Sequence, residues 1–259
     1  MSIELRDLSF SFGNRRVLDG LSFEVPDGGM ACVLGPNGVG KTTLFRCMLG
    51  LAPGYRGEVR VNGHDLRDLS VRRRAREMAY IPQAHVNVFD YEAVDMVLMA
   101  CGTGLGMLRS PARRHEERAL AALERVGIAD LAHRSVNRLS GGQLQLVLVA
   151  RAIAQNSRAL VMDEPTSALD FANADRVLAL ARELAREGRS VIVSTHRPEQ
   201  AYLYFDQVIA LGEKGVLGCG TPQEVITGEC MSRLYGTDVT VSPLFDDRAR
   251  SCVPSARLV

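Results

Sequence analysis

The segment from Gly35 to Thr43, GPNGVGKTT, combines three glycines, one lysine and two hydroxyl side chains. The spacing of Gly35, Gly40 and Lys41 satisfies the pattern G-x-x-x-x-G-K-[ST], in which backbone amides wrap phosphate oxygens and the lysine reaches the β- and γ-phosphates. Thr42 supplies the hydroxyl that meets Mg²⁺ in this pattern. The alternative is a glycine-rich turn that holds no ligand. The candidate phosphate-binding residues are Gly35, Pro36, Asn37, Gly38, Val39, Gly40, Lys41, Thr42 and Thr43.

The residues on either side predict the elements that position this loop. An apolar run, Met30 to Leu34, comes before it and is typical of a buried strand. After it, apolar residues follow the i, i+3, i+4, i+7 spacing of one helix face: Leu44, Cys47, Met48 and Leu51. A helix that starts near Lys41 directs the positive end of its dipole toward a bound anion. We therefore expect a strand, a phosphate loop and a helix in succession.

Two adjacent carboxylates supply the chemistry that a phosphate loop lacks. The apolar run Leu160 to Met162 delivers Asp163 to the carboxyl end of a strand, and Glu164 follows at once. Because side chains alternate along a strand, Asp163 can face Mg²⁺ while Glu164 faces the attacking water. The alternative is that the pair merely ends a strand before Pro165.

Composition limits the classes of partner. The chain has 259 residues and a formal net charge of +1, which gives no sign of a polyanion partner. The basic run 71–77 lacks interleaved aromatic residues and is typical of a solvated helix face, so we expect no nucleic-acid binding. The six cysteines form no C-x-x-C pair, which favours reduced thiols.

Membrane and secretion signals are weak. The N-terminal residues MSIELRDLSF carry acids where a signal peptide would be basic and then apolar. The longest apolar runs fall short of the roughly 18 residues that span a bilayer. Any role at a membrane therefore requires a partner protein.

The pattern along the chain predicts an α/β fold. Residues 3–34 alternate like an antiparallel β-region, and residues 57–63 add a short strand. The pattern becomes helical from about residue 91 to residue 127, and a β-α-β alternation follows from residue 159. Residues 242–259 show little periodicity, and we expect them to form a loosely ordered tail.

A second glycine-bearing helix start lies at Leu139–Gln143, LSGGQ. Ser140 is a good N-cap residue, and the glycines expose backbone amides to an anion; the alternative is a simple capped turn. With the phosphate loop and the carboxylate pair, this segment makes the chain resemble the ATP-binding subunits of ABC transporters, from Ile3 to about Val241. The resemblance implies a P-loop NTPase (ABC ATPase) core with an antiparallel β-subdomain and a helical signature subdomain, at about 91–150, within a domain of residues 1–241. It also implies ATP hydrolysis, with ATP and Mg²⁺ as cofactors.

The resemblance assigns further residues by their place in the pattern. It implies that Phe12 stacks on adenine, that Gln83 contacts Mg²⁺ and water, and that His196 holds the γ-phosphate. It also implies that Asp170 lies in the segment that crosses between two subunits. The implied catalytic residues are Glu164, His196 and Gln83, the metal ligands are Thr42, Gln83 and Asp163, and the signature contacts are Ser140, Gly141, Gly142 and Gln143. Leu144 and Arg197 depart from the pattern, where a basic and an acidic residue are common.

The resemblance also implies partners. One set of motifs indicates half of a homodimer that joins two integral membrane permease subunits and, through them, an extracytoplasmic substrate-binding protein, at the cytoplasmic face of the cell membrane. The pattern looks most like importers of iron-siderophore, haem or cobalamin. Another substrate such as molybdate, or a soluble non-transport ABC ATPase, is the alternative. The apolar residues after Gln83 predict the permease contact: Val86, Val88, Phe89 and Tyr91. The alternative is that these side chains pack the helical subdomain onto the core.

Overall fold

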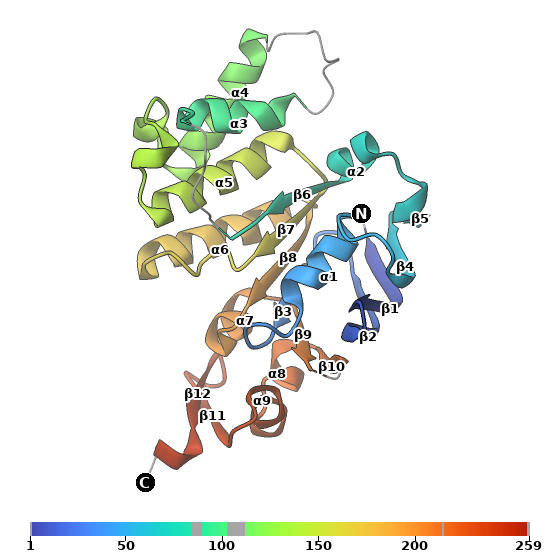
Figure 1. The fold of residues 1–259 in the computed structure, drawn as a ribbon. Helices are drawn as coiled ribbons and strands as arrows, with labels where there is room; N and C mark the ends of the chain where they lie inside the picture. Colours follow the sequence, from blue (N-terminus) through green and yellow to red (C-terminus); the bar gives the residue numbers. More distant parts are fainter. Residues whose placement is uncertain (1, 84–89, 103–111, 214, 258–259) are drawn as a thin grey trace.

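In the computed structural model, two larger sheets and a small hairpin carry the strands (Figure 1). The structure describes residues 2–83, 90–102, 112–213 and 215–257. The strands are β1 (Ile3–Phe12), β2 (Arg15–Val25), β3 (Met30–Leu34), β4 (Arg56–Val61), β5 (His64–Asp65), β6 (Met78–Ile81), β7 (Ala159–Asp163), β8 (Ser190–Thr195), β9 (Gln207–Gly212), β10 (Gly215–Gly220), β11 (Val239–Leu244) and β12 (Ala249–Pro254). The α-helices are α1 (Lys41–Met48), α2 (Val71–Glu77), α3 (Ala93–Cys101), α4 (Arg113–Val126), α5 (Gly141–Gln155), α6 (Phe171–Arg186), α7 (Pro198–Tyr204), α8 (Pro222–Val225) and α9 (Gly228–Tyr235). Short 3₁₀ turns occupy Leu66–Asp68, Ala129–Leu131, Val136–Arg138 and Ser255–Arg257.

The central sheet has the strand order β10-β9-β3-β8-β7-β6, with β10 antiparallel to β9 and the other pairs parallel. Every residue of β3, β7 and β8 is buried. Strands covered on both faces are apolar throughout, which explains the continuous runs in the sequence. The carboxyl ends of β3 and β7 therefore meet at one edge of this sheet.

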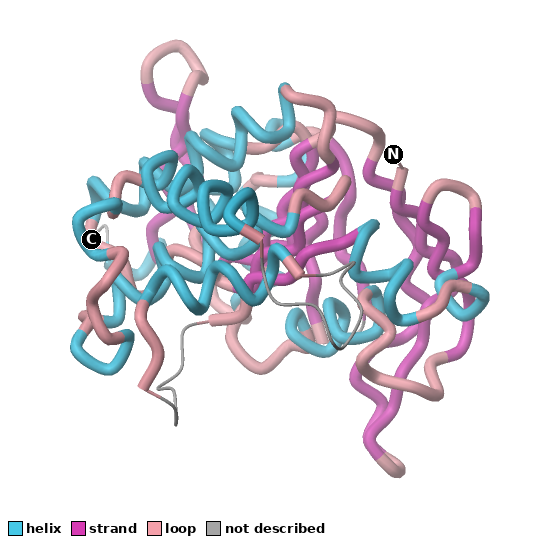
Figure 2. The backbone as a smooth tube through the Cα atoms, turned by 90° about the horizontal axis from the view of Figure 1, so that it is seen from above, coloured by secondary structure: helices cyan, strands magenta, loops and turns pink. Residues whose placement is uncertain are grey.

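The antiparallel sheet has the order β2-β1-β4-β5. The expected antiparallel region 3–34 was too long, because it ends at Val25: β3 pairs in parallel with β8 and β9. Helix α1 lies between the two sheets (Figure 1), and its fully buried Phe45 belongs to the core cluster that joins them. Seen from above, most helices lie on one side of the central strands and the antiparallel strands on the other (Figure 2).

Helices α3, α4 and α5 form the expected helical region. Their apolar stripes share one core cluster with the central sheet, and the stripe of α4 is buried, at Ala119, Ala122, Leu123 and Val126. Of the predicted permease-contact residues, Val86, Val88 and Phe89 lie outside the described residues, and Tyr91 is exposed. Within the described ranges, the structure contains no helix whose length and hydropathy would suit a membrane crossing.

The C-terminal residues differ from the loosely ordered tail that we expected. Strands β11 and β12 pair in register from Val239 with Pro254 to Leu244 with Ala249. Arg250 fixes this hairpin to the body of the protein by donating hydrogen bonds to the carbonyls of Gln223 and Ile226, at 2.9 and 2.8 Å. Its guanidinium also stacks 5.0 Å from the centre of the Tyr202 ring. Side-chain anchors of this kind leave no periodic signal in the sequence.

Candidate functional site

The phosphate loop, residues 35–43, connects β3 to α1 at the carboxyl edge of the central sheet. Gly40 precedes α1 with a left-handed φ of 114°, and a Cβ there would lie 2.9 Å from Val17 Cγ1. A Cβ on Gly35 would lie 2.5 Å from the carbonyl oxygen of Leu211. Neither position accepts a side chain, so both glycines are required by local geometry as well as by the motif.

Lys41 is buried and curls back over this loop. Its Nζ donates to the carbonyl oxygens of Gly35 and Pro36, at 2.7 and 3.0 Å, and lies 3.0 Å from Glu164 Oε1. These contacts hold a positive charge beside the backbone amides at the start of α1. The arrangement suits a multiply charged phosphate.

Asp163 ends β7 at the centre of a hydrogen-bonded cluster. Its carboxylate accepts from the hydroxyls of Thr42 at 2.6 Å, Ser194 at 2.7 Å and Tyr80 at 3.3 Å. Burial and the neighbouring Asp163 charge raise the pKa of the Tyr80 phenol, so Tyr80 stays protonated and donates. Thr42 and Asp163 thus place two oxygen ligands side by side, a set that fits Mg²⁺, which keeps most of its ligands as waters and substrate phosphates.

The carboxylate of Glu164 lies between the side chains of Lys41 and His196. Its Oε1 contacts Lys41, and its Oε2 lies 3.2 Å from His196 Nδ1. The backbone of Glu164 has a positive φ of 46°, and its amide donates to Ser194 Oγ at 2.9 Å. Positive φ is unfavourable for a non-glycine residue, and such strain is commonly found at functional sites. The predicted pairing of Asp163 with Glu164 therefore gives two carboxylates with different neighbours.

Gln83 joins the same cluster through Ser167, and His196, which contacts Glu164 directly, has a further partner on α9. Gln83 donates from Nε2 to Ser167 Oγ at 3.3 Å, and Ser167 in turn donates to the Glu164 carbonyl oxygen at 3.0 Å. The His196 carbonyl accepts from the Tyr235 hydroxyl at 2.9 Å. Sequence reasoning missed three residues of this cluster, Tyr80, Ser194 and Tyr235, and it singled out Ser167 only as part of the segment that crosses between two subunits. Only Ser194 left a signal, a polar residue near the end of an apolar strand and opposite Asp163 in the register.

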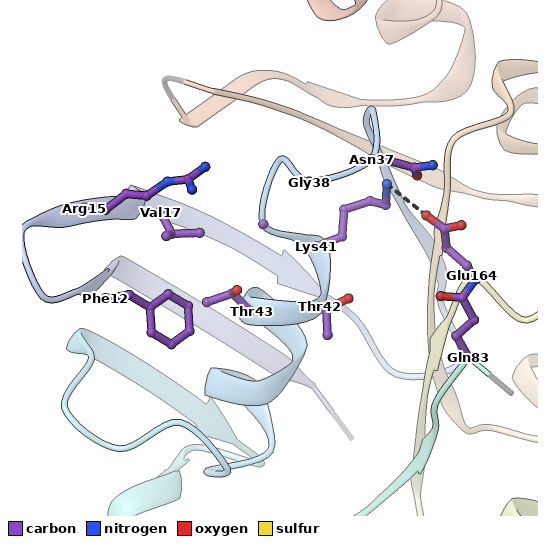
Figure 3. A pocket seen from close by; sticks show the side chains of 11 residues that line it. Phe12, Arg15, Val17, Asn37, Gly38, Lys41, Thr42, Thr43, Gln83 and Glu164 are labelled. Atoms are coloured by element: carbon purple, nitrogen blue, oxygen red, sulfur yellow. Dashed lines mark ion pairs between the residues drawn. The ribbon is translucent and has the colours of Figure 1, made fainter. Parts of the chain in front are cut away.

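A cavity of about 470 Å³ joins these groups to the antiparallel sheet (Figure 3). The ring of Phe12 is 56% exposed at one end, with its edge against Phe10 at a centroid distance of 4.9 Å. Glu164 and Gln83 lie at the other end (Figure 3). The lining comprises Phe12, Arg15, Val17, Asn37, Gly38, Gly40, Lys41, Thr42, Thr43, Gln83 and Glu164. The cavity thus brings together residues that the sequence had singled out separately.

The signature segment, residues 139–143, is not part of this lining. Ser140 caps α5 by accepting from the Gln143 amide at 3.2 Å, and Gln143 Oε1 accepts from the Ser140 amide at 3.0 Å. Asp170 likewise caps α6, with its carboxylate accepting from the Asn173 backbone and side-chain amides. Both predicted contact sites are therefore helix starts that lie apart from the phosphate loop of the same chain.

The two departures from the pattern occupy structural positions. Leu144 is buried in the core beneath the start of α5. Arg197 precedes α7, and its backbone amide donates to Thr195 Oγ1 at 3.2 Å.

Comparison with known proteins agrees with this geometry. Residues 18–167 match the family model described as ABC transporter. The "Hemin import ATP-binding protein" of Deinococcus radiodurans is 39% identical over 93% of this chain and 92% of its own length. The "Probable iron chelatin transport ATP-binding protein" of Helicobacter pylori is 36% identical over 92% and 94%. Manganese and zinc transport ATP-binding proteins of Bacillus subtilis and Treponema pallidum match at 35% and 34% identity, over at least 92% of each chain.

The fold agrees with solved structures as well. A chain from a metal-chelate type ABC transporter in an inward-facing conformation superposes with a TM-score of 0.87 at 29% identity, over 100% of this chain and 99% of that one.

Proposed function

The chain belongs to the ABC transporter family of ATP-binding proteins, and on this premise we propose that it hydrolyses ATP to drive a metal-chelate importer. The general function, an ATPase subunit of an ABC importer, follows from the family match and the importer relatives. We propose further that the transported substrate is an iron-siderophore, haem or cobalamin. Relatives named for iron chelatin and hemin transport support this substrate class. The manganese and zinc relatives define the competing substrates.

One observation carries the ATPase proposal: Glu164 faces the cavity between Lys41 and His196. Lys41 and the loop amides bind the β- and γ-phosphates, and Glu164 accepts the proton of the water that attacks the γ-phosphorus. His196, in contact with Glu164 Oε2, orients that carboxylate and donates to the γ-phosphate. Mg²⁺, when bound by Thr42 and Asp163 with Gln83 nearby, neutralises charge on the phosphates.

The signature segment supports a homodimer. Its exposed helix start at Ser140 is an anion-binding surface, yet it does not line the cavity of its own chain. A second copy would place this surface over the phosphate loop, with Asp170 near the contact. We further propose that residues 1–241 form the ATP-binding domain, with the helical part at about 91–150 inserted in it.

A groove of about 440 Å³ supports a membrane partner. It lies where the ends of α1, α2, α3 and α5 meet, and its rim carries three exposed apolar side chains, Leu51, Val71 and Met99. The partly buried side chain of Arg151 also lines this groove, so an acid is a favourable neighbour for its charge. We propose that a short permease segment with apolar residues and one acid occupies the groove, which places the chain at the cytoplasmic face of the membrane.

The test is reconstitution with the permease and the binding protein in vesicles. Wild-type chain should show Mg²⁺-dependent ATP hydrolysis coupled to uptake of one of the three metal chelates. Free manganese, zinc and molybdate serve as competing cargoes. Uptake of one of these instead would overturn the proposed substrate class, and absence of ATP hydrolysis would overturn the proposed function as a whole.

A further inference from the structure

Arg15 shares a face of the antiparallel sheet with Phe12. It begins β2 directly opposite Phe12 in the β1–β2 register. Opposed residues in an antiparallel pair point to the same face, with Cβ atoms about 5 Å apart. Both side chains line the 470 Å³ cavity, and Figure 3 shows the guanidinium reaching toward the phosphate loop.

The start of β2 is held tightly against that loop. Val17, which lines the same cavity as Arg15, approaches so closely that a Cβ on Gly40 would meet its Cγ1 at 2.9 Å. Arg15 also lines a second hollow of about 520 Å³, together with Asn37 and Gly38. In Figure 3, Arg15 and Lys41 lie on two sides of the loop at Gly38. The loop is therefore flanked by two cations, of which the phosphate-binding pattern accounts only for Lys41.

Two neighbouring cations, Lys41 and Arg16, are engaged. Lys41 contacts Glu164 and two backbone carbonyls, and Arg16 donates to both carboxylate oxygens of Asp19, at 3.0 and 3.1 Å. The side chain of Arg15 makes no hydrogen bond or ion pair with any residue in the described ranges, even though Glu213 lines the second hollow. A guanidinium that is directed toward the phosphate loop and has no carboxylate partner suits a phosphate, which it can bind through two parallel N–H groups.

The position of Arg15 in the cavity indicates which phosphate of the nucleotide it binds. Lys41 and Glu164 mark the end of the cavity where the β- and γ-phosphates lie in the proposed function, and Phe12 marks the end that receives the base. Arg15, as the neighbour of Phe12, lies where the nucleotide passes from base to phosphate. Resting on the proposed function, we infer that Arg15 is a nucleotide-binding residue that holds the α-phosphate, the one phosphate that ATP, ADP and AMP share.

The experiment measures dissociation constants by calorimetry on the full chain, in EDTA to prevent hydrolysis. The ligands are ATP, ADP, AMP and adenosine. Arg15→Gln should weaken binding of all three phosphorylated ligands by about tenfold, the usual effect of losing a hydrogen bond to a charged group, and leave adenosine unchanged. Arg15→Lys keeps the charge without the planar fork and should lose less affinity.

Two controls separate the possible causes. Arg16→Gln removes a charge of equal size one residue away and should leave all four affinities at the wild-type level. Lys41→Ala should weaken ATP and ADP but spare AMP, because the lysine serves the other phosphates. Unchanged ATP and ADP affinity in Arg15→Gln, an equal loss in Arg16→Gln, or an equal loss for adenosine would each overturn this inference alone. A wild-type chain that binds no adenine nucleotide would overturn the proposed function as well.

Discussion

Lys41 and Glu164, 123 positions apart in the sequence, form a buried ion pair in which Nζ lies 3.0 Å from Oε1. In the proposed mechanism, the lysine serves the nucleotide phosphates and the glutamate serves the attacking water. In this structure the two charges satisfy each other. The proposed mechanism therefore requires ATP to draw Lys41 from the carboxylate to the phosphates, which would leave Glu164 with His196 and free to accept a proton.

Glu164→Gln should keep ATP binding while reducing turnover by about 100-fold or more, because the amide keeps the shape but cannot accept the proton. Phosphate release and ATP affinity are measured on the same preparation. Glu183→Gln, an exposed position on α6, is the matched control. Near-normal turnover in Glu164→Gln would remove this residue from the role of base.

Lys41→Ala should weaken ATP binding by tenfold or more, since the charge on the β- and γ-phosphates is lost. The substitution also leaves Glu164 without its strongest cation, so a fall in the melting temperature is expected with it. Titration with a fluorescent ATP analogue checks the affinity. An ATP affinity equal to that of the wild type would contradict the phosphate-loop interpretation.

The sequence predicts the site better than it predicts the connections between its parts. Local motifs predict Lys41 and Asp163. Lys41 belongs to a pattern of fixed spacing, and Asp163 follows an apolar run at the end of a strand. Tyr80 and Tyr235 reach the cluster through tertiary packing alone, and no short spacing marks them. The hairpin of β11 and β12 was missed for the same reason, since its anchor, Arg250, bonds to carbonyls that lie 24 and 27 positions earlier.

The proposed homodimer predicts a specific outcome when two defective subunits are mixed. One subunit carries Lys41→Ala and the other carries Ser140→Arg, and two affinity tags isolate the mixed pair. If each ATP site joins the phosphate loop of one copy to the signature segment of the other, one site carries both defects and the other carries neither. Nucleotide counting should then find one intact site per pair.

Sites confined to single subunits give a different count. Each copy would then hold one singly damaged site, and the mixed pair would show two equally impaired sites. That count would contradict the two-subunit model. Pairs in which both copies carry the same substitution provide the baseline for each defect.

The C-terminal hairpin should be sensitive to Arg250 and to acid. Arg250→Gln should lower the melting temperature by about 2–4 °C at pH 7, because hydrogen bonds to two backbone carbonyls are lost. Hydrogen bonds from Arg250 also hold the pKa of Asp247 below its usual value. A depressed carboxyl pKa stabilises the fold above the unfolded-state value near 3.8 and loses this contribution as pH falls through the folded value.

The difference in melting temperature between wild type and Arg250→Gln should therefore shrink between pH 5 and pH 2. Arg248→Gln, an exposed neighbour in the hairpin, controls for the change in net charge. A difference that stays constant over this range would show that the Asp247 carboxylate contributes nothing to the anchor.

A substitution in the groove between α1, α2, α3 and α5 can test the proposed contact with the permease. Val71 is 80% exposed at the first position of α2, where an acidic side chain is favourable to the helix dipole, so Val71→Asp should leave folding and basal ATP hydrolysis unchanged. A charge in the apolar rim should nevertheless weaken binding to the permease by tenfold or more, since a partner segment would have to desolvate it. Co-purification with the permease measures the loss, and Leu203→Asp, at an exposed position on α7, is the matched control. Full assembly of Val71→Asp with the permease, and loss of assembly in Leu203→Asp, would place the contact on α7 instead of in the groove.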